Sequence, residues 1–241
     1  MTSIRIGCSG WQYRDWRGDF YPSDLATARW LEFYAQHFDT VELNASFYRL
    51  PRATTFGAWG RRVPAGFKMA VKASRYLTHL KRLRDPDEPL TRLWSRAEEL
   101  GAALGPMLYQ LPPHWRVDTE RLTGFLQAVP AGRAQAIEFR DASWYRADVH
   151  AALAEAGVAL CLHDMPGSTP DAVPVGPFAY VRFHGAGTRY GGRYPTQALR
   201  AWADRLLEWA GNGIPSWVYF NNDIGGHAPR DALRLRELVT R

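Results

Sequence analysis

Ala136-Ile137-Glu138-Phe139-Arg140 is the segment from which the architecture can be inferred. Apolar and charged residues alternate in it, which is typical of a β-strand with Ile137 and Phe139 on one side and Glu138 and Arg140 on the other. Burying a Glu and an Arg is costly unless they pair with each other or face a solvated cleft. We therefore expect the apolar side to pack under a helix and the charged side to face a cleft.

The same one-sided alternation predicts four more strands, which cover residues 40–44, 67–72, 178–184 and 217–221. Three further apolar segments complete a set of eight, and they cover residues 4–8, 107–111 and 158–163. Segments with helical spacing of apolar residues separate the strands, except for residues 164–176, which are rich in Pro and Gly. The helix between the sixth and seventh strands is therefore expected to be missing or vestigial.

This order of elements predicts the α/β class and a single (β/α)8 TIM-type barrel domain over residues 1–241. A doubly wound parallel sheet is the competing architecture. Its central strands would be apolar on both faces, because helices cover both faces of such a sheet. Five strands here are apolar on one side only, which favours the barrel, whose other side points inward.

The composition is that of a globular protein, with 46% hydrophobic residues and no linker or repeat that would divide the chain. No apolar run is long enough to span a bilayer, and the N-terminus lacks the profile of a signal peptide. Cys8 and Cys161 are the only cysteines, which suits a reducing compartment. The expected location is the cytoplasm, with no membrane partner.

The net charge of +6 favours anionic partners, although so Arg-rich a composition can also arise without functional meaning. Ten Trp residues are a stronger deviation, because Trp suits a ligand cleft as well as a core. Nucleic acid and a small anionic or sugar-like ligand are both predicted as partners. The sequence does not indicate an oligomeric state.

Polar side chains gather near the C-terminal ends of the predicted strands, where barrel enzymes keep their chemistry. We predict catalytic roles for those that can donate or accept a proton, which are Glu138, Glu42, Lys72, His184 and His163. Desolvation and neighbouring cations could also make Lys72 a nucleophile. We predict substrate-binding roles for Asn44, Gln110, Arg140, Arg182, Asn221, Tyr48, Trp144, Arg189 and Arg193.

Several alternatives stay open. The rim charges could neutralise one another in a structural network, for instance Glu138 with Lys72 and Glu42 with Arg182. No metal ligand and no cofactor is predicted, because HxH, HExxH and CxxC spacings are absent and Lys72 with its neighbouring Arg residues would repel a cation. A divalent metal nevertheless remains an alternative, since carboxylates and His at strand ends can bind one.

Two loops could bind an anion. The glycine-rich loop at residues 185–195 lies where barrels often hold phosphate and carries Arg189 and Arg193. The basic segment at residues 75–84 could be a lid over an anionic substrate. For each loop a simple solvated surface is the alternative.

Seven short motifs, spread in order over nearly the whole chain, carry a family resemblance: Gly7-Cys8-Ser9-Gly10-Trp11, Gly18-Asp19-Phe20-Tyr21-Pro22, Thr40-Val41-Glu42-Leu43-Asn44 with Phe47-Tyr48, Gln110-Leu111-Pro112, Glu138-Phe139-Arg140 with Ser143-Trp144, Arg182-Phe183-His184-Gly185, and Tyr219-Phe220-Asn221-Asn222. Together they resemble the YecE-like family, also called domain of unknown function 72. The resemblance implies a TIM-type barrel and no settled activity, with a loose kinship to sugar isomerases and to metal-dependent endonuclease barrels.

The chain departs from the family pattern at two positions. Members often have Thr where Cys8 stands and His where Asp141 stands, which argues against catalytic roles for these two residues. The combined expectation is an enzyme that uses acid–base chemistry on a small anionic or polyhydroxylated substrate, bearing a sugar or a phosphate. Isomerase, lyase and hydrolase chemistry all remain open. The alternatives are an endonuclease-like, nucleic-acid-processing barrel and a non-catalytic ligand-binding protein.

Overall fold

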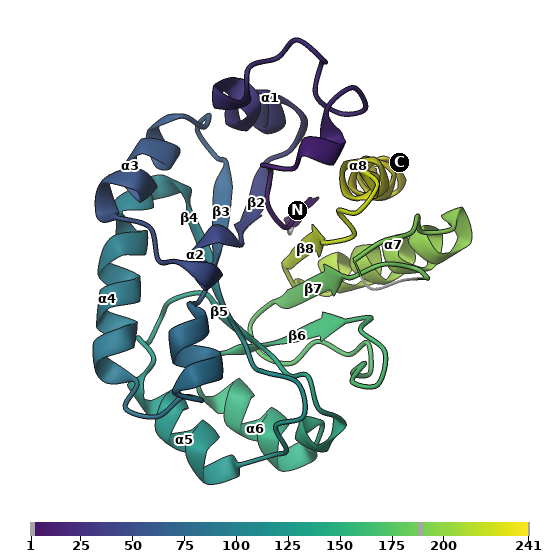
Figure 1. Cartoon of the computed structure of the whole chain (residues 1–241). Coiled ribbons are helices and arrows are strands. Elements are labelled where there is room, and N and C mark those ends of the chain that lie inside the picture. The colour runs from purple at the N-terminus through teal and green to yellow at the C-terminus, as the bar shows by residue number, and fades with distance from the viewer. Residues whose placement is uncertain (1–2, 188–189, 241) are drawn as a thin grey trace.

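The computed structural model describes residues 3–187 and 190–240. It contains one eight-stranded sheet in the order β1-β8-β7-β6-β5-β4-β3-β2, and the paired strands are parallel. The sheet curls into a nearly closed barrel with helices around it (Figure 1). The strands are β1 (Ile4–Cys8), β2 (Thr40–Leu43), β3 (Lys68–Lys72), β4 (Leu104–Gln110), β5 (Gln135–Glu138), β6 (Ala159–His163), β7 (Ala179–Phe183) and β8 (Ser216–Phe220). The predicted barrel is confirmed.

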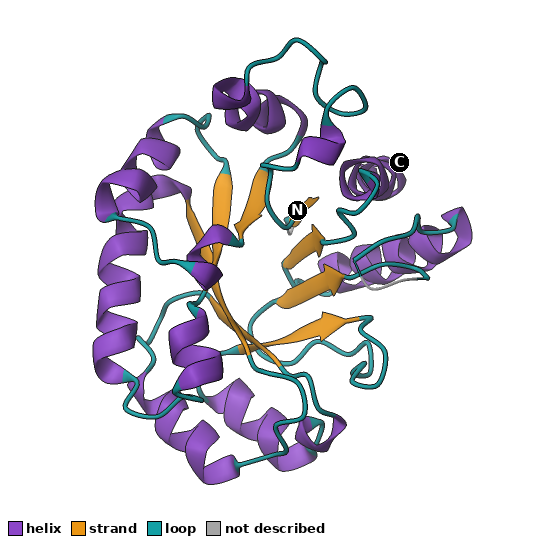
Figure 2. Ribbon diagram, in the orientation of Figure 1, coloured by secondary structure: helices purple, strands orange, loops and turns teal. Residues whose placement is uncertain are grey.

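Most of the α-helices lie outside the strands, whereas the short α2 lies over the strand ends (Figure 2). They are α1 (Trp30–His37), α2 (Ala45–Tyr48), α3 (Ala53–Arg61), α4 (Asp87–Ala97), α5 (Thr119–Ala128), α6 (Ala147–Glu155), α7 (Thr196–Gly211) and α8 (His227–Thr240). The connection from β6 to β7 contains no helix, as its Pro and Gly content predicts. Asp118 caps the N-terminus of α5, because its carboxylate accepts a hydrogen bond of 3.0 Å from the backbone N–H of Arg121. No helix among the described residues is long and apolar enough to cross a membrane.

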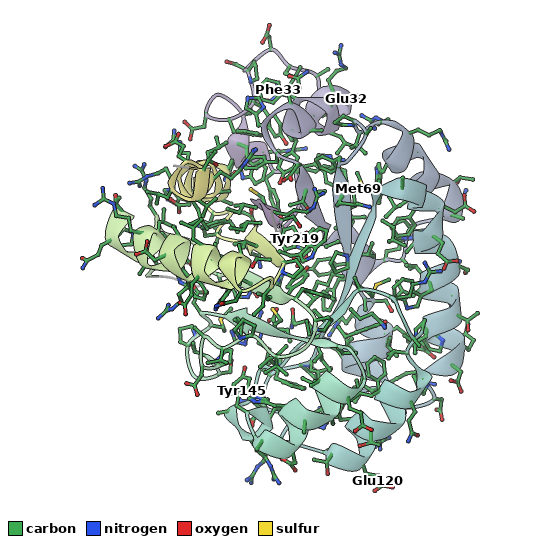
Figure 3. All side chains as sticks on the ribbon, turned by 180° about the vertical axis from the view of Figure 1, so that it is seen from behind. Glu32, Phe33, Met69, Glu120, Tyr145 and Tyr219 are labelled. Carbon is green, nitrogen blue, oxygen red and sulfur yellow. The ribbon has the colours of Figure 1, made fainter. Side chains whose placement is uncertain are left out.

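Two buried layers follow from the alternation along the strands. Side chains on the outer face, such as Val41, Ile137 and Val218, pack in the large core between strands and helices. A smaller cluster fills the lower part of the barrel, and it includes Ala70, Leu108, Ala136, Ala159, Cys161, Tyr180 and Tyr219. Figure 3 shows side chains filling the space that the strands enclose, with Tyr219 among them. The lower barrel is therefore a packed core.

The seam between β1 and β2 is closed by a side chain instead of a full ladder of backbone hydrogen bonds. The Tyr34 hydroxyl of α1 accepts the N–H of Cys8 at 2.7 Å and donates to the carbonyl of Thr40 at 3.0 Å. A Cβ atom at Gly7 would lie 2.2 Å from the Thr40 oxygen and 2.8 Å from the Tyr34 hydroxyl. Glycine is therefore required at residue 7 for the barrel to close.

Candidate functional site

Arg182 on β7 is the centre of a layer of paired charges inside the barrel. Its side chain is fully buried, and Nη1 donates to Oε2 of Glu138 at 2.6 Å while Nη2 donates to Oε1 of Glu42 at 2.9 Å. The expected pair of Glu42 with Arg182 is thus present. The expected pair of Glu138 with Lys72 is not, because Arg182 and Arg140 take the Glu138 carboxylate instead.

Further donors complete the shells of the two carboxylates. Glu42 accepts hydrogen bonds from the Ser9 hydroxyl and, at 2.6 Å, from the Tyr180 hydroxyl. Glu138 accepts from Nε of Arg140. Burial alone would raise the pKa of Glu138, but the Arg140 and Arg182 guanidinium groups outweigh it and hold this pKa well below its ordinary value. A carboxylate held in this way is a weak base near neutral pH, so the geometry favours a positioning role for Glu138.

His163 at the end of β6 is fixed by the backbone at both ring nitrogens. Nδ1 accepts the N–H of Met165 at 3.1 Å, and Nε2 lies 2.8 Å from the carbonyl of Phe139. Nδ1 must therefore be unprotonated and Nε2 must carry the proton. Burial lowers the pKa of His163 to about 4, so the ring stays neutral at physiological pH. The contacts favour a structural role for this predicted catalytic residue.

His184, which follows β7, faces two other predicted site residues. Its Nε2 accepts from Nη2 of Arg140 at 3.1 Å, and its Nδ1 lies 3.1 Å from the side-chain amide of Asn221. Burial, followed by the charge of Arg182, lowers the pKa of His184 well below its ordinary value. The imidazole is therefore a neutral link between the paired charges and Asn221.

Lys72, the last residue of β3, differs from the other interior charges. Only 8% of the residue is exposed, yet no carboxylate of the described residues lies within 4 Å of its Nζ. The Nζ atom instead lies over the ring of Phe47, at 4.2 Å from the centroid. Burial, with help from the positive charge of Arg182, lowers the pKa of Lys72 to about 7. This environment agrees with the desolvation considered for Lys72 from the sequence, and its role as a nucleophile stays a prediction.

Lys72 lines a cavity of about 390 Å³, which we call the mouth cavity. The cavity is lined by Tyr13, Asp15, Asn44, Tyr48, Lys72, Tyr190, Asn221, Asp223 and Ile224. Buried Oδ1 atoms of Asn44 and of Asp223 have no hydrogen-bond partner within the described part of the chain. Unsatisfied buried acceptors are costly, so they mark places where a ligand donor or water completes the site.

Asp223 is the most acid–base-relevant of the cavity residues that the sequence reasoning missed, which also include Tyr13, Asp15, Tyr190 and Ile224. Burial raises the pKa of Asp223 well above the ordinary value, which favours the protonated form of its carboxyl group. It stands two residues beyond Asn221 in the polar run Asn221-Asn222-Asp223 that follows β8. That run after a strand was the available signal, but an Asp in a loop is usually solvated.

The other predicted binding residues lie in different surroundings. Gln110 and Arg140 line a second cavity of about 280 Å³ on the β4–β6 side of the barrel. Tyr48 stands at the rim of the mouth cavity and is 82% exposed. Trp144 is a correction: it is fully buried, stacks on Phe139 and donates Nε1–H to the carbonyl of Trp115 at 2.6 Å, so it packs in the core away from both cavities.

The structure describes part of the first predicted anion-binding loop and all of the second. Arg189 lies outside the described residues, and Arg193 is half-exposed with its Nε 3.9 Å from the Asp231 carboxylate of α8. The basic segment contains a π-helical turn, Tyr76–Leu80, in which Leu77 and Thr78 are buried. This turn anchors the segment on the barrel, and its role as a lid stays a prediction.

A metal site is not formed by the usual donor types in the described residues. Over residues 3–187 and 190–240, no three His, Cys, Asp or Glu side chains come together in a way that could hold a metal ion. The carboxylates of Glu42 and Glu138 are instead bound by the protein's own guanidinium and hydroxyl donors.

The architecture defines a (β/α)8-barrel protein with its polar groups at the C-terminal ends of the strands. The family model described as "Protein of unknown function DUF72" matches residues 5–241, and the chain belongs to this family. The UPF0759 protein YunF of Bacillus subtilis is 27% identical over 98% of this chain and 94% of its own length. The UPF0759 protein YecE of Escherichia coli is 27% identical over 59% of this chain and 50% of its own length. The family expected from the motifs is thus confirmed.

Solved structures show the same fold. A DUF72 family protein from Thermotoga maritima MSB8 superposes with a TM-score of 0.90, at 27% identity, over 99% of this chain and all of its own. A D-psicose 3-epimerase from Clostridium cellulolyticum H10 superposes with a TM-score of 0.54, at 12% identity, over 98% of both chains. The second likeness shows that the barrel architecture is shared and carries no evidence about substrate.

Proposed function

We propose that this protein is an enzyme that carries out acid–base chemistry on a small anionic or polyhydroxylated substrate in the mouth cavity. The observation that carries the proposal is the Lys72 amine, which is buried, faces the cavity and has no carboxylate within 4 Å among the described residues. An unpaired buried lysine is costly to keep in a structural core, and such a residue is a candidate functional group.

The protonation states of two cavity residues suit proton transfer. With a pKa of about 7, Lys72 is present as both amine and ammonium at neutral pH, which is the condition for an efficient general base. Burial raises the pKa of Asp223 well above its ordinary value, which favours a carboxyl group that can supply a proton. The cavity therefore contains a candidate base and a candidate acid.

Charge and hydrogen bonding indicate the class of substrate. The carboxylates of Glu42 and Glu138 are balanced by the guanidinium groups of Arg182 and Arg140, so a protonated Lys72 is the surplus charge of this buried layer. A surplus cation attracts an anion such as a phosphate or carboxylate. The side-chain amides of Asn44 and Asn221 line the same cavity and match the hydroxyl groups of a sugar.

The proposal predicts ligand binding that depends on Lys72. We expect fructose 6-phosphate, ribose 5-phosphate or a related sugar phosphate to raise the melting temperature of the wild type, because a ligand at 100 times its Kd stabilises the native state by about 2.7 kcal/mol. Lys72→Met should weaken this binding at least about tenfold, since one charge-assisted contact contributes roughly 1.5–3 kcal/mol. Thermal shift and calorimetric titration measure both effects.

The matched control is Lys81→Met, which removes a lysine that pairs with Asp85 on the surface and should leave binding unchanged. Short single- and double-stranded DNA forms a second arm of the test. Binding to DNA that falls steeply with salt, without any response to sugar phosphates, would contradict the proposal and favour nucleic-acid processing instead.

A further inference from the structure

We infer that Lys72 is a nucleophile that forms an imine with the carbonyl group of its substrate, so that the substrate class is an aldehyde or ketone such as an open-chain sugar or sugar phosphate. This inference rests on the proposed function and deepens it. Its geometric basis is the placement of Nζ at the wall of the mouth cavity, with an aromatic ring on one side and unpartnered oxygen atoms in the same cavity.

The free amine needed for attack is available for structural reasons. A lysine in an ion pair keeps its proton, and the interior carboxylates that could form such a pair with Lys72 are taken by Arg140 and Arg182. Burial then lowers the pKa of Lys72 to about 7, which leaves about half of the amine unprotonated at neutral pH. The paired-charge layer thus keeps the carboxylates away from this amine.

The reaction balances with groups that line the cavity. The Lys72 nitrogen attacks the carbonyl carbon, a new C–N bond forms, and the carbonyl oxygen takes a proton from the neutral carboxyl group of Asp223. The added nitrogen gives one of its two protons to the Asp223 carboxylate, and Asp223 passes this proton to the hydroxyl group of the carbinolamine, so that the C–O bond breaks and the hydroxyl group leaves as water. The nitrogen keeps its other proton in a protonated imine, and loss of that proton to the Asp223 carboxylate gives the neutral imine. Overall, one amine and one carbonyl give one imine and one water, with no oxidant or reductant.

The surroundings also suit the product. A protonated imine is a cation, and the Phe47 ring that lies 4.2 Å from Nζ can stabilise it as it stabilises the ammonium. The iminium draws electrons from the adjacent carbon, so a C–H or C–C bond at that carbon breaks more easily. After it has given up its proton, Asp223 is the group in the cavity that can accept one back. These roles indicate isomerase or lyase chemistry and assign the nucleophile to Lys72 and proton transfer to Asp223.

Reductive trapping tests the inference. The intact protein is incubated with dihydroxyacetone phosphate and sodium borohydride, which reduces an imine to a stable secondary amine, and the modified peptide is identified by mass spectrometry. We expect one adduct at Lys72, formed at least tenfold faster than at Lys68 or Lys81, with a rate that rises with pH around pH 7. Lys72→Arg should abolish this adduct, whereas Lys81→Arg should leave it unchanged.

Two outcomes would overturn the inference in distinguishable ways. Sugar phosphates that stabilise the wild type without any adduct at Lys72 would leave the proposed function standing and exclude the imine. Adducts spread over the surface amines, together with no thermal stabilisation by sugar phosphates, would remove both. Because Lys72→Arg could disturb the fold, its far-ultraviolet circular dichroism and melting temperature are compared with those of the wild type, and the site of the wild-type adduct decides the question on its own.

Discussion

Replacing Arg182 with Met is expected to destabilise the barrel by about 3–5 kcal/mol, the typical cost of removing one partner of a buried ion pair. Arg182 is fully buried and donates to both Glu42 and Glu138. Methionine fills part of the space but leaves two carboxylates in the barrel with less compensation. The ion pairs of Arg182 with Glu42 and Glu138 are thus required for stable folding, although they lie near the C-terminal ends of the strands, where the candidate site is.

This destabilisation should shrink at low pH. In the wild type the folded-state pKa of Glu138 is depressed, so its stabilising contribution is present above the unfolded value of about 4.3 and is lost as pH falls through the folded pKa. In the variant, burial without Arg182 raises the carboxyl pKa values, and these groups instead favour folding when they are protonated. Urea denaturation at pH 7 and pH 5 measures the difference.

The control for Arg182→Met is Arg146→Met. Arg146 forms an ion pair with Asp148 in which both side chains are about half exposed, so its loss should leave the stability almost unchanged. A loss below about 1 kcal/mol for Arg182→Met at pH 7 would show that the charge layer is not coupled to folding as the contacts indicate.

The second large effect has the opposite sign. Lys72→Met should stabilise the protein near pH 6 by several kcal/mol, because it removes a buried ammonium that lacks a carboxylate within 4 Å in the described chain. The gain should decrease as pH rises. Between pH 7 and about 10.5 the unfolded wild type binds a proton at Lys72 that the folded state lacks, so wild-type stability rises in this window by up to about 1.4 kcal/mol per pH unit.

Chemical denaturation of both proteins from pH 6 to pH 9 measures this trend. Methionine is a suitable replacement because it keeps an unbranched chain of similar length without the charge. If Lys72→Met is less stable than the wild type over the whole range, Lys72 balances interior carboxylates and the unpaired amine is not a property of the protein in solution.

Much of the barrel could be predicted from the sequence because its strands have two different environments. Helices cover the outer face of the strands, so residues there are apolar, such as Val41 and Ile137. The inner face near the strand ends contains charged residues, such as Glu42 and Glu138. This alternation needs only the period of two residues and no knowledge of tertiary contacts. The pairing of Glu42 with Arg182, which the sequence leaves open as one structural alternative, agrees with this alternation because both side chains point inward.

The rest of the site depends on distances around the barrel. The cation that pairs with Glu138 depends on how far each side chain extends across the barrel interior. Arg182 extends far enough to donate hydrogen bonds to both Glu138 and Glu42. Trp144 follows the strand as a binding residue would, but tertiary packing places it against Phe139. The raised pKa of Asp223 arises from burial. The sequence places Asp223 in a loop and does not show that its carboxyl group is buried. Charge balance, and hence the isolation of Lys72, emerges only once these contacts are known.

The central claim is that the Lys72 amine at the mouth cavity has no carboxylate partner among the described residues and has a pKa near neutral pH. Direct titration of this amine tests it. The chain has only three lysines, Lys68, Lys72 and Lys81, so a protein labelled with 13C at the lysine ε-carbon gives few signals, and the one absent from Lys72→Arg is assigned to Lys72. The account predicts a titration midpoint near pH 7 for that signal. A midpoint near pH 10, the ordinary value for lysine, would contradict it.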